Sequence, residues 1–198
     1  MEKATLMKMR LFAATVVALI TGGLGACSNS SKTDYQKLLG AATFSLPSAI
    51  DKALAVKEAQ GLIVVNAEIE EENGRIIYSM ELANGKKILE INFDVTDGSM
   101  LPLETEDHDK SEQAKASKIT AKQAIEIATG KVDGKAVEAS LLMKEGKPVC
   151  DVKVFTPKGK LHTVTLNAVT GEVAMITKEA KKDKAQEAEK EEKEEKKR

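Results

Sequence analysis

Apolar and polar positions follow the same pattern twice along this chain of 198 residues. From Val65 to Ile69 apolar residues alternate with polar ones, and a second alternating run begins after an Asn-Gly pair at positions 73 and 74. The pattern returns 72 residues later, from Val137 to Leu141 (137 minus 65). An internal duplication with this spacing predicts two copies of one small folding unit.

A helical pattern precedes each alternating stretch. Apolar residues recur there at the i, i+3, i+4 and i+7 spacing of a buried stripe. The stripes are Leu46, Ala49, Ile50 and Ala53 in the first copy and Ala121, Ala124, Ile125 and Ala128 in the second. Ser45 and Thr120 stand where each helix should begin, because their hydroxyl groups can cap a helix N-terminus. Gly61 and Gly130 are expected to end the helices, which would make the second helix the shorter one.

After each helix the hydrophobic period changes to two, which is typical of strands with one buried face. In the first copy, Asn-Gly pairs at 73–74 and 84–85 separate three strands, and Asp97-Gly98 leads to a short fourth strand around Met100. The predicted fold class is therefore α+β. Each repeat should consist of one helix packed on an antiparallel sheet of three to four strands, with the other face of the sheet polar.

Six segments of the first copy have close counterparts in the second. They are Ala49–Ala53, Gly74, Tyr78–Leu82, Gly85, Phe93–Asp94 and Asp97–Gly98, matched by 124–128, 146, 150–154, 159, 166–167 and 170–171. This set resembles the PepSY domain, which occurs in the propeptides of thermolysin-like metalloproteases and in free-standing secreted or membrane-bound proteins. Cys150 and Asn167 depart from the aromatic residue and the aspartate that are usual in the family. The resemblance implies a fold without catalytic motifs, and protease inhibition has been proposed for the family.

The first residues have the order of a secretory signal. A basic start is followed by an apolar run from Leu11 to Ile20, which is short for a spanning helix, and then by Leu24–Cys27, which resembles a bacterial lipobox. We expect Cys27 to carry a lipid that anchors the protein on the periplasmic side or at the cell surface. Ordinary cleavage beside Ala26, which would leave a secreted or periplasmic soluble protein, is the alternative.

Composition supplies the remaining boundaries. The expected segments are a signal peptide (1–26), a tether (27–42), a first repeat (43–104), a linker (105–117), a second repeat (118–177) and a charged low-complexity tail (178–198). Residues 43–104 carry 11 acidic and 5 basic side chains, whereas residues 117–178 carry 6 acidic and 10 basic ones. The two repeats therefore have opposite net charge.

Candidate catalytic chemistry is sparse. The chain has two histidines, His108 among linker carboxylates and His162 at the start of a strand, and neither has a partner nucleophile in a known motif. We expect no enzyme activity, no metal site and no cofactor. A net charge of −1 and the absence of tryptophan argue against nucleic-acid binding. Cys150 aligns with Tyr78 on an apolar strand face, so a small buried residue is expected there rather than a reactive thiol.

We therefore expect a non-catalytic extracytoplasmic binding module that inhibits or modulates an envelope protease. A structural or adaptor lipoprotein of the envelope is the alternative. The expected contacts are an envelope protein and, through Cys27, the membrane. Glu68, Glu70, Glu81 and Glu90 should lie on the polar face of the first sheet and bind a basic partner. The sequence does not predict an oligomeric state.

Overall fold

The computed structural model describes residues 34–84, 88–106 and 110–179, which belong to one compact unit. Cys27, His108 and most of the charged tail lie outside the described residues. The helices are α1 (Tyr35–Ala41), α2 (Leu46–Leu54), α3 (Ser111–Ala116) and α4 (Ala121–Lys131), with a 3-10 turn η1 at Lys57–Ala59. The strands are β1 (Ile63–Glu72), β2 (Arg75–Ala83), β3 (Ile88–Asp94), β4 (Glu104–Glu106), β5 (Lys135–Lys144), β6 (Lys147–Phe155), β7 (Leu161–Asn167) and β8 (Val173–Lys178).

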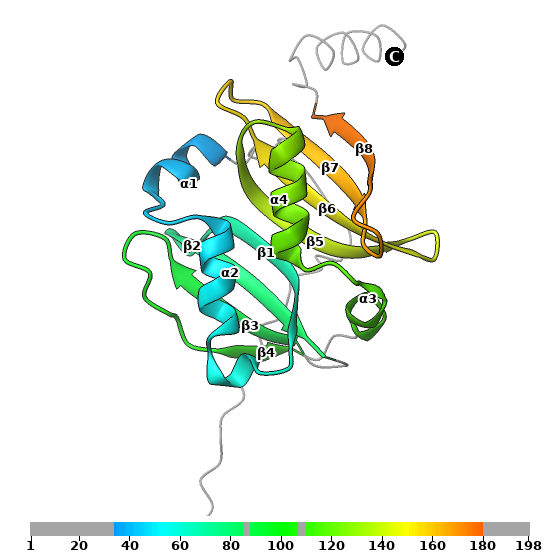
Figure 1. The fold of residues 1–198 in the computed structure, drawn as a ribbon. Coiled ribbons are helices and arrows are strands. Elements are labelled where there is room, and N and C mark those ends of the chain that lie inside the picture. Colours follow the sequence, from blue (N-terminus) through cyan, green and yellow to red (C-terminus); the bar gives the residue numbers. More distant parts are fainter. Residues whose placement is uncertain (1–33, 85–87, 107–109, 180–198) are drawn as a thin grey trace, which may run out of the picture. The chain divides into compact units, whose positions relative to one another are not determined.

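These strands form a single antiparallel sheet, in the order β4-β3-β2-β1-β5-β6-β7-β8, so the described chain is α+β (Figure 1). The first half of the chain (residues 34–106) and the second half (residues 110–179) thus share one sheet, which β1 and β5 join at its centre. At this junction Ala67 lies opposite Ala139, the residue 72 positions later (139 minus 67). Equivalent positions of the two halves therefore face one another, as they do in a two-fold symmetric dimer.

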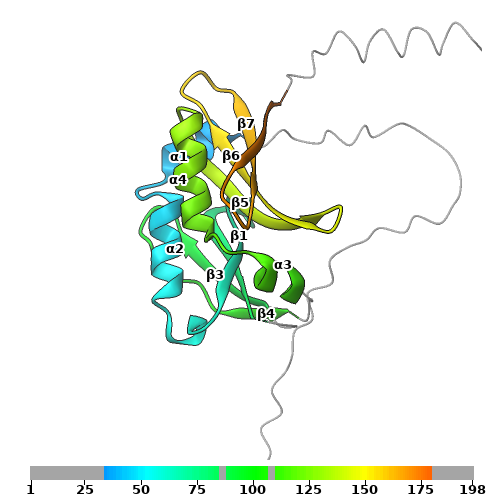
Figure 2. The ribbon, with the colours of Figure 1, turned by 45° about the vertical axis from the view of Figure 1, so that its right-hand side comes forward.

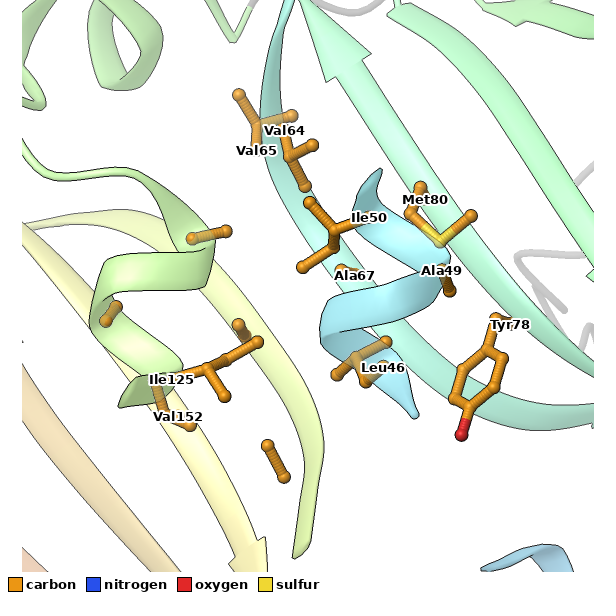
Figure 3. Packing of buried hydrophobic residues seen from close by; sticks show 14 of the residues in the cluster. Leu46, Ala49, Ile50, Val64, Val65, Ala67, Tyr78, Met80, Ile125 and Val152 are labelled. Atoms are coloured by element: carbon orange, nitrogen blue, oxygen red, sulfur yellow. The ribbon is translucent and has the colours of Figure 1, made fainter. Parts of the chain in front are cut away.

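Helices α2 and α4 cover the same face of the sheet (Figure 2). Their predicted apolar stripes are confirmed, since the side chains of Leu46 and Ile50 in α2 and of Ile125 in α4 are buried. Figure 3 shows Ile125 directed toward α2, and Leu46 and Ile50 directed toward α4. Together with the inward residues of the strands they belong to one hydrophobic core that runs through both halves.

The predicted helix starts are also confirmed. The Ser45 hydroxyl accepts a hydrogen bond from the backbone N–H of Ser48, and Thr120 and Gln123 form a reciprocal capping box. Each cap satisfies backbone donors that the first turn of a helix leaves without intrahelical partners.

The predicted helix ends are wrong. Helix α2 ends at Leu54, before η1, and Gly61 follows η1 with a φ of +75°. Gly130 lies inside α4, which is the longer helix, with 11 residues against 9. A glycine in a helix costs only about 1 kcal/mol relative to alanine. Packing of Ala128 and Val132, which flank this position and are both buried, outweighs that cost.

The hairpin turn at Asn73-Gly74 is confirmed, because both residues have positive φ (51° and 76°). The expected fourth strand around Met100 is wrong, since Met100 makes an isolated bridge to Phe93 and the strand that pairs with β3 is β4. Three residues are too few to show a period of two, so the sequence pattern could not reveal β4.

Two short helices lie in segments for which the sequence predicts a tether and a linker. Helix α1 contacts β1, and α3 contacts β1 and β5. Leu39 of α1 and Ala114 of α3 are 75 positions apart (114 minus 39), which is also the spacing between the caps of α2 and α4. The two helices could have been predicted by extending the comparison at this 75-residue offset to the residues that precede the apolar stripes.

Candidate binding surface

The four predicted glutamates lie on the face of the sheet opposite α2 and α4. Side chains alternate between the two faces of a strand, and Ala67 and Ile69 of β1 point into the core. Their neighbours Glu68 and Glu70 therefore point to the other face. Glu81 of β2 lies opposite Glu90 of β3 in the register, on this same face. We call Glu68, Glu70, Glu81 and Glu90 the acidic face.

Three of the four carboxylates have polar partners. Asn66 Nδ2 donates to Glu68 Oε1 (3.0 Å), and Asn92 Nδ2 donates to Glu90 Oε1 (2.7 Å). Glu81 forms an ion pair with Lys110, which precedes α3. Glu70 differs from the other three, because no hydrogen bond or ion pair joins it to another residue in the described part of the chain.

Burial and like charges raise the pKa of Glu70 to about 7. Desolvation makes the largest contribution, and the negative charges of Glu68, Glu72, Glu90 and Glu81 add to it. The carboxylate is therefore only partly ionised at neutral pH. A cation placed beside it would favour its ionised form and would relieve the repulsion among the carboxylates.

The pKa of Glu68 is raised as well. Burial is again the main cause, and the charge of Glu138 on the neighbouring strand adds to it, while the hydrogen bond from Asn66 and the charge of Lys153 act in the opposite direction. The negative charges that oppose ionisation of Glu68 and Glu70 therefore lie mainly on the first half of the sheet and extend to Glu138 at the β1–β5 junction.

On the second half of this face, acidic groups are paired. Lys153 Nζ lies 2.6 Å from Glu138 Oε2, and Lys144 Nζ lies 2.7 Å from Asp151 Oδ2. The hydroxyl of Thr165 also donates to Asp151 Oδ1 (2.7 Å). The charge asymmetry that the sequence shows between its two halves therefore becomes an asymmetry across one sheet face.

This face is less open than strict alternation predicts. Ile77, which lies opposite Glu70, and Ser79, which lies opposite Glu68, are buried although both point away from α2. Asn92 is 5% exposed, and its Oδ1 has no hydrogen-bond partner in the described part of the chain. Glu68 and Glu70 are half-buried, which explains why their pKa values are raised.

The nucleophile and base candidates do not form a site. Cys150 is a free, fully buried thiol, as expected, and burial raises its pKa to about 12. His162 is half-buried on β7, opposite Val154 of β6. Among the described residues no group of three or more His, Cys, Asp and Glu side chains could hold a metal ion.

Comparison with known proteins identifies one segment of the chain. Residues 118–174 match the PepSY family model, whose description is the peptidase propeptide and YPEB domain. The matched segment extends from just before α4 to the start of β8 and so includes most of the second half. No helix within the described ranges is long and apolar enough to cross a membrane.

One curated relative is the "Uncharacterized membrane protein YkoI" of Bacillus subtilis (strain 168). The two sequences are 34% identical over 102 residues, which cover 52% of this chain and 43% of YkoI. The chain therefore spans less than half the length of this relative.

Three solved structures show similarity at lower identity. A protein described as a lipoprotein, from Clostridium difficile 630, is 18% identical, with a TM-score of 0.43 over 69% of this chain and 95% of that one. The YpmB protein of Bacillus subtilis is 17% identical (TM-score 0.30; 65% and 96% covered). The C-terminal domain of YpeB from Bacillus megaterium is also 17% identical (TM-score 0.30; 71% and 67% covered).

Proposed function

We propose that this protein is a non-catalytic extracytoplasmic binding module whose acidic face receives a basic segment of an envelope protease and thereby inhibits or modulates it. The observation that carries the proposal is the state of Glu70, a half-buried carboxylate among other carboxylates with no ion-pair partner in the described chain. A lysine or arginine side chain of a partner would supply the missing charge.

The PepSY match supports the choice of a protease as the partner, since the family model is described by its occurrence in peptidase propeptides. A module of this kind acts by occupying a surface, so inhibition should be stoichiometric and non-covalent. The similarity to a membrane protein of Bacillus subtilis supports a location at the membrane. A lipid on Cys27 would hold the module there.

We further propose that the first half is a second, diverged copy of the PepSY unit. Both β1 and β5 carry a register shift at equivalent places, between Val64 and Asn66 and between Ala136 and Glu138. Asn73 and Glu145, also 72 positions apart (145 minus 73), share a φ of +51° at the hairpin turns. Two unrelated sequences would not be expected to place the same irregularities at one offset.

Titration of purified residues 28–198 against envelope proteases tests the main proposal, with a lysine-rich peptide as a simple probe of the acidic face. We expect saturable binding that weakens as salt concentration rises, because the attraction is between charges. The double substitution Glu70→Gln and Glu81→Gln should weaken binding, whereas Glu58→Gln in the exposed turn η1 should not. If no protease is bound or inhibited saturably, the proposed function is wrong.

The lipid anchor has its own test. Cys27→Ala should abolish incorporation of labelled fatty acid and should release the protein from the membrane fraction. Unchanged protein mass and fractionation in this variant would contradict lipidation and would support ordinary cleavage beside Ala26.

A further inference from the structure

Two cavities flank the contact between α2 and α4, on the helix-covered face of the sheet. The helices are joined by an ion pair in which Lys122 Nζ lies 2.7 Å from Asp51 Oδ2. The first cavity, of about 480 Å³, is lined by residues of α1, α2, β2, α4 and β5, and we call it the α1 cavity. The second, of about 500 Å³, is lined by residues of α2, α3, α4, β1 and β5, and we call it the α3 cavity.

The two cavities are built from equivalent positions of the two halves. Each combines the start of one long helix with the end of the other long helix and the strand that follows it. In the α1 cavity the lining includes Phe44, Leu46, Ile125, Thr129, Gly134 and Lys135, and the counterparts in the α3 cavity are Ile119, Ala121, Ile50, Leu54, Leu62 and Ile63. The internal symmetry therefore produces two copies of one cavity, whose side chains have diverged.

The divergence makes the α3 cavity aliphatic. Leu54, Leu62 and Ile63 take the places that Thr129, Gly134 and Lys135 hold in the α1 cavity. Leu54 and Ile63 remain 44% and 36% exposed, although both are large apolar side chains. Exposed aliphatic groups around a cavity of this size favour an apolar ligand that would remove them from water.

Lys118 is the basic residue of the α3 cavity lining that is available to a ligand, because Lys122 is already paired with Asp51. The lining of this cavity contains Lys118 and Lys122 and no acidic residue, whereas the lining of the α1 cavity contains both Glu126 and Lys135.

Helix α4 also begins at the α3 cavity, with Ala121 as its first residue. The N-terminus of a helix carries a partial positive charge that favours an anion, although the capping box already bonds the backbone N–H groups of Thr120 and Gln123 here.

We propose that the α3 cavity binds a free fatty acid, with its aliphatic chain between α2, α3 and β1 and its carboxylate beside Lys118 and the N-terminus of α4. The charge of Lys118 favours a carboxylate over an amine, and the side chains of Leu54, Leu62 and Ile63 favour a hydrocarbon chain. A volume of about 500 Å³ lies within the roughly 300–1,000 Å³ that is usual for small-molecule sites. The site does not involve the acidic face, which lies on the other side of the sheet.

Calorimetric titration of the full chain with sodium octanoate, decanoate and dodecanoate tests the proposal, each ligand being kept below its micelle concentration. Burial of each additional methylene group contributes about 0.8 kcal/mol, so two methylenes should raise the affinity about fifteenfold until the cavity is full. An affinity that does not change with chain length would overturn the proposal.

Substitutions locate the ligand. The double variant Leu54→Thr and Ile63→Lys gives the α3 cavity the residues of its counterpart at two partly exposed positions, and it should lower the dodecanoate affinity at least tenfold. Leu142→Thr is the matched control, because Leu142 is also partly exposed (37%) but does not line the cavity. Equal affinities in the double variant and the control, with unchanged circular dichroism, would show that the ligand binds elsewhere.

A charge reversal tests the position of the carboxylate. Lys118→Glu should weaken the binding of dodecanoate several-fold and leave that of dodecan-1-ol unchanged, since the alcohol has the same chain without the charge. An equal loss for both ligands would contradict the placement of the carboxylate beside Lys118.

Discussion

At the scale of single residues, Glu70 and Cys150 owe their chemistry to their surroundings. Burial among other carboxylates raises the pKa of Glu70 to about 7, and complete burial raises that of the Cys150 thiol to about 12. In both cases folding favours the neutral form of the side chain, because transfer of a charge from water into the protein is unfavourable. Two of our predictions concern these residues.

The first prediction concerns the pH dependence of stability. A carboxyl group whose pKa is raised by folding binds its proton more tightly in the folded state, so stability falls as pH rises between the unfolded and folded pKa values. For Glu70 this interval extends from 4.5 to about 7. Glu70→Gln should therefore unfold at a higher denaturant concentration than the unchanged protein at pH 8, with a smaller difference at pH 4.5.

Denaturant titrations at several pH values measure this effect, with Glu58→Gln as the control for loss of an exposed carboxylate. For Glu58→Gln, the difference in stability from the parent protein should be about the same at pH 4.5 and at pH 8. A difference between Glu70→Gln and the parent that is the same at pH 4.5 and pH 8 would contradict the raised pKa.

The second prediction concerns thiol reactivity. At pH 8 a thiol with a pKa of about 12 is almost entirely protonated, and the thiolate is the reactive form. In a Cys27→Ser background, Cys150 should therefore react with a disulfide reagent only after denaturant unfolds the protein. Rapid labelling of the folded protein would show that Cys150 is accessible and ionisable, contrary to its buried position.

At the scale of elements, α2 and α4 are held by their apolar stripes more than by helix propensity. Helix α2 has 9 residues, and an isolated helix shorter than about 12 residues is marginal in water. Caps at Ser45 and Thr120 determine where the helices begin. Packing decides where they end, as the position of Gly130 inside α4 shows.

The third prediction follows from this packing. Ile50→Ala and Ile125→Ala should each lower the free energy of unfolding by about 2 to 5 kcal/mol, because each leaves a cavity under a helix. Leu54→Ala, on the same helix as Ile50 but 44% exposed, should cost clearly less. Chemical denaturation measures the three values, and equal losses at Ile50 and Leu54 would contradict the burial of the stripe.

At the scale of the whole molecule, the β1–β5 pairing makes one sheet and one core from two similar halves. Units of roughly sixty residues are marginal when they fold alone, since a small domain buries a limited share of its surface. Sharing a sheet removes an exposed strand edge from each half and lets α4 contact β1 as well as its own strands. Each half therefore stabilises the other.

The fourth prediction is that the two halves unfold together. Ile50 lies in the first half of the chain. Ile50→Ala should nevertheless accelerate hydrogen exchange of backbone amides in β6, which belongs to the second half, as well as in β2. Exchange measured by mass spectrometry under mildly denaturing conditions separates the two strands. Unchanged protection of β6 in this variant would show that the halves are independent domains, joined by a linker rather than by a shared core.

Local patterns in the sequence were sufficient to predict most elements. The stripes around Ile50 and Ile125, the caps and the Asn73-Gly74 turn each depend on residues close together in the chain, and all are confirmed. The faces of the strands followed from alternation, which placed Glu68 and Glu70 opposite the core. Strand β4 and helices α1 and α3 were missed, because each is too short for a period to be visible.

Tertiary structure alone decided how these elements act together. Alternation predicts the face on which Glu70 lies but not how deeply it is buried. Its burial depends on the neighbouring strands, so its pKa is raised only in the folded protein. The ion pair between Glu81 and Lys110 and the α3 cavity unite residues that are distant in the chain. The sequence by itself determined the repeated helix and strands, because their periodicity is local. The single sheet was decided only in the tertiary structure, where β1 pairs with β5 and Ala67 lies opposite Ala139.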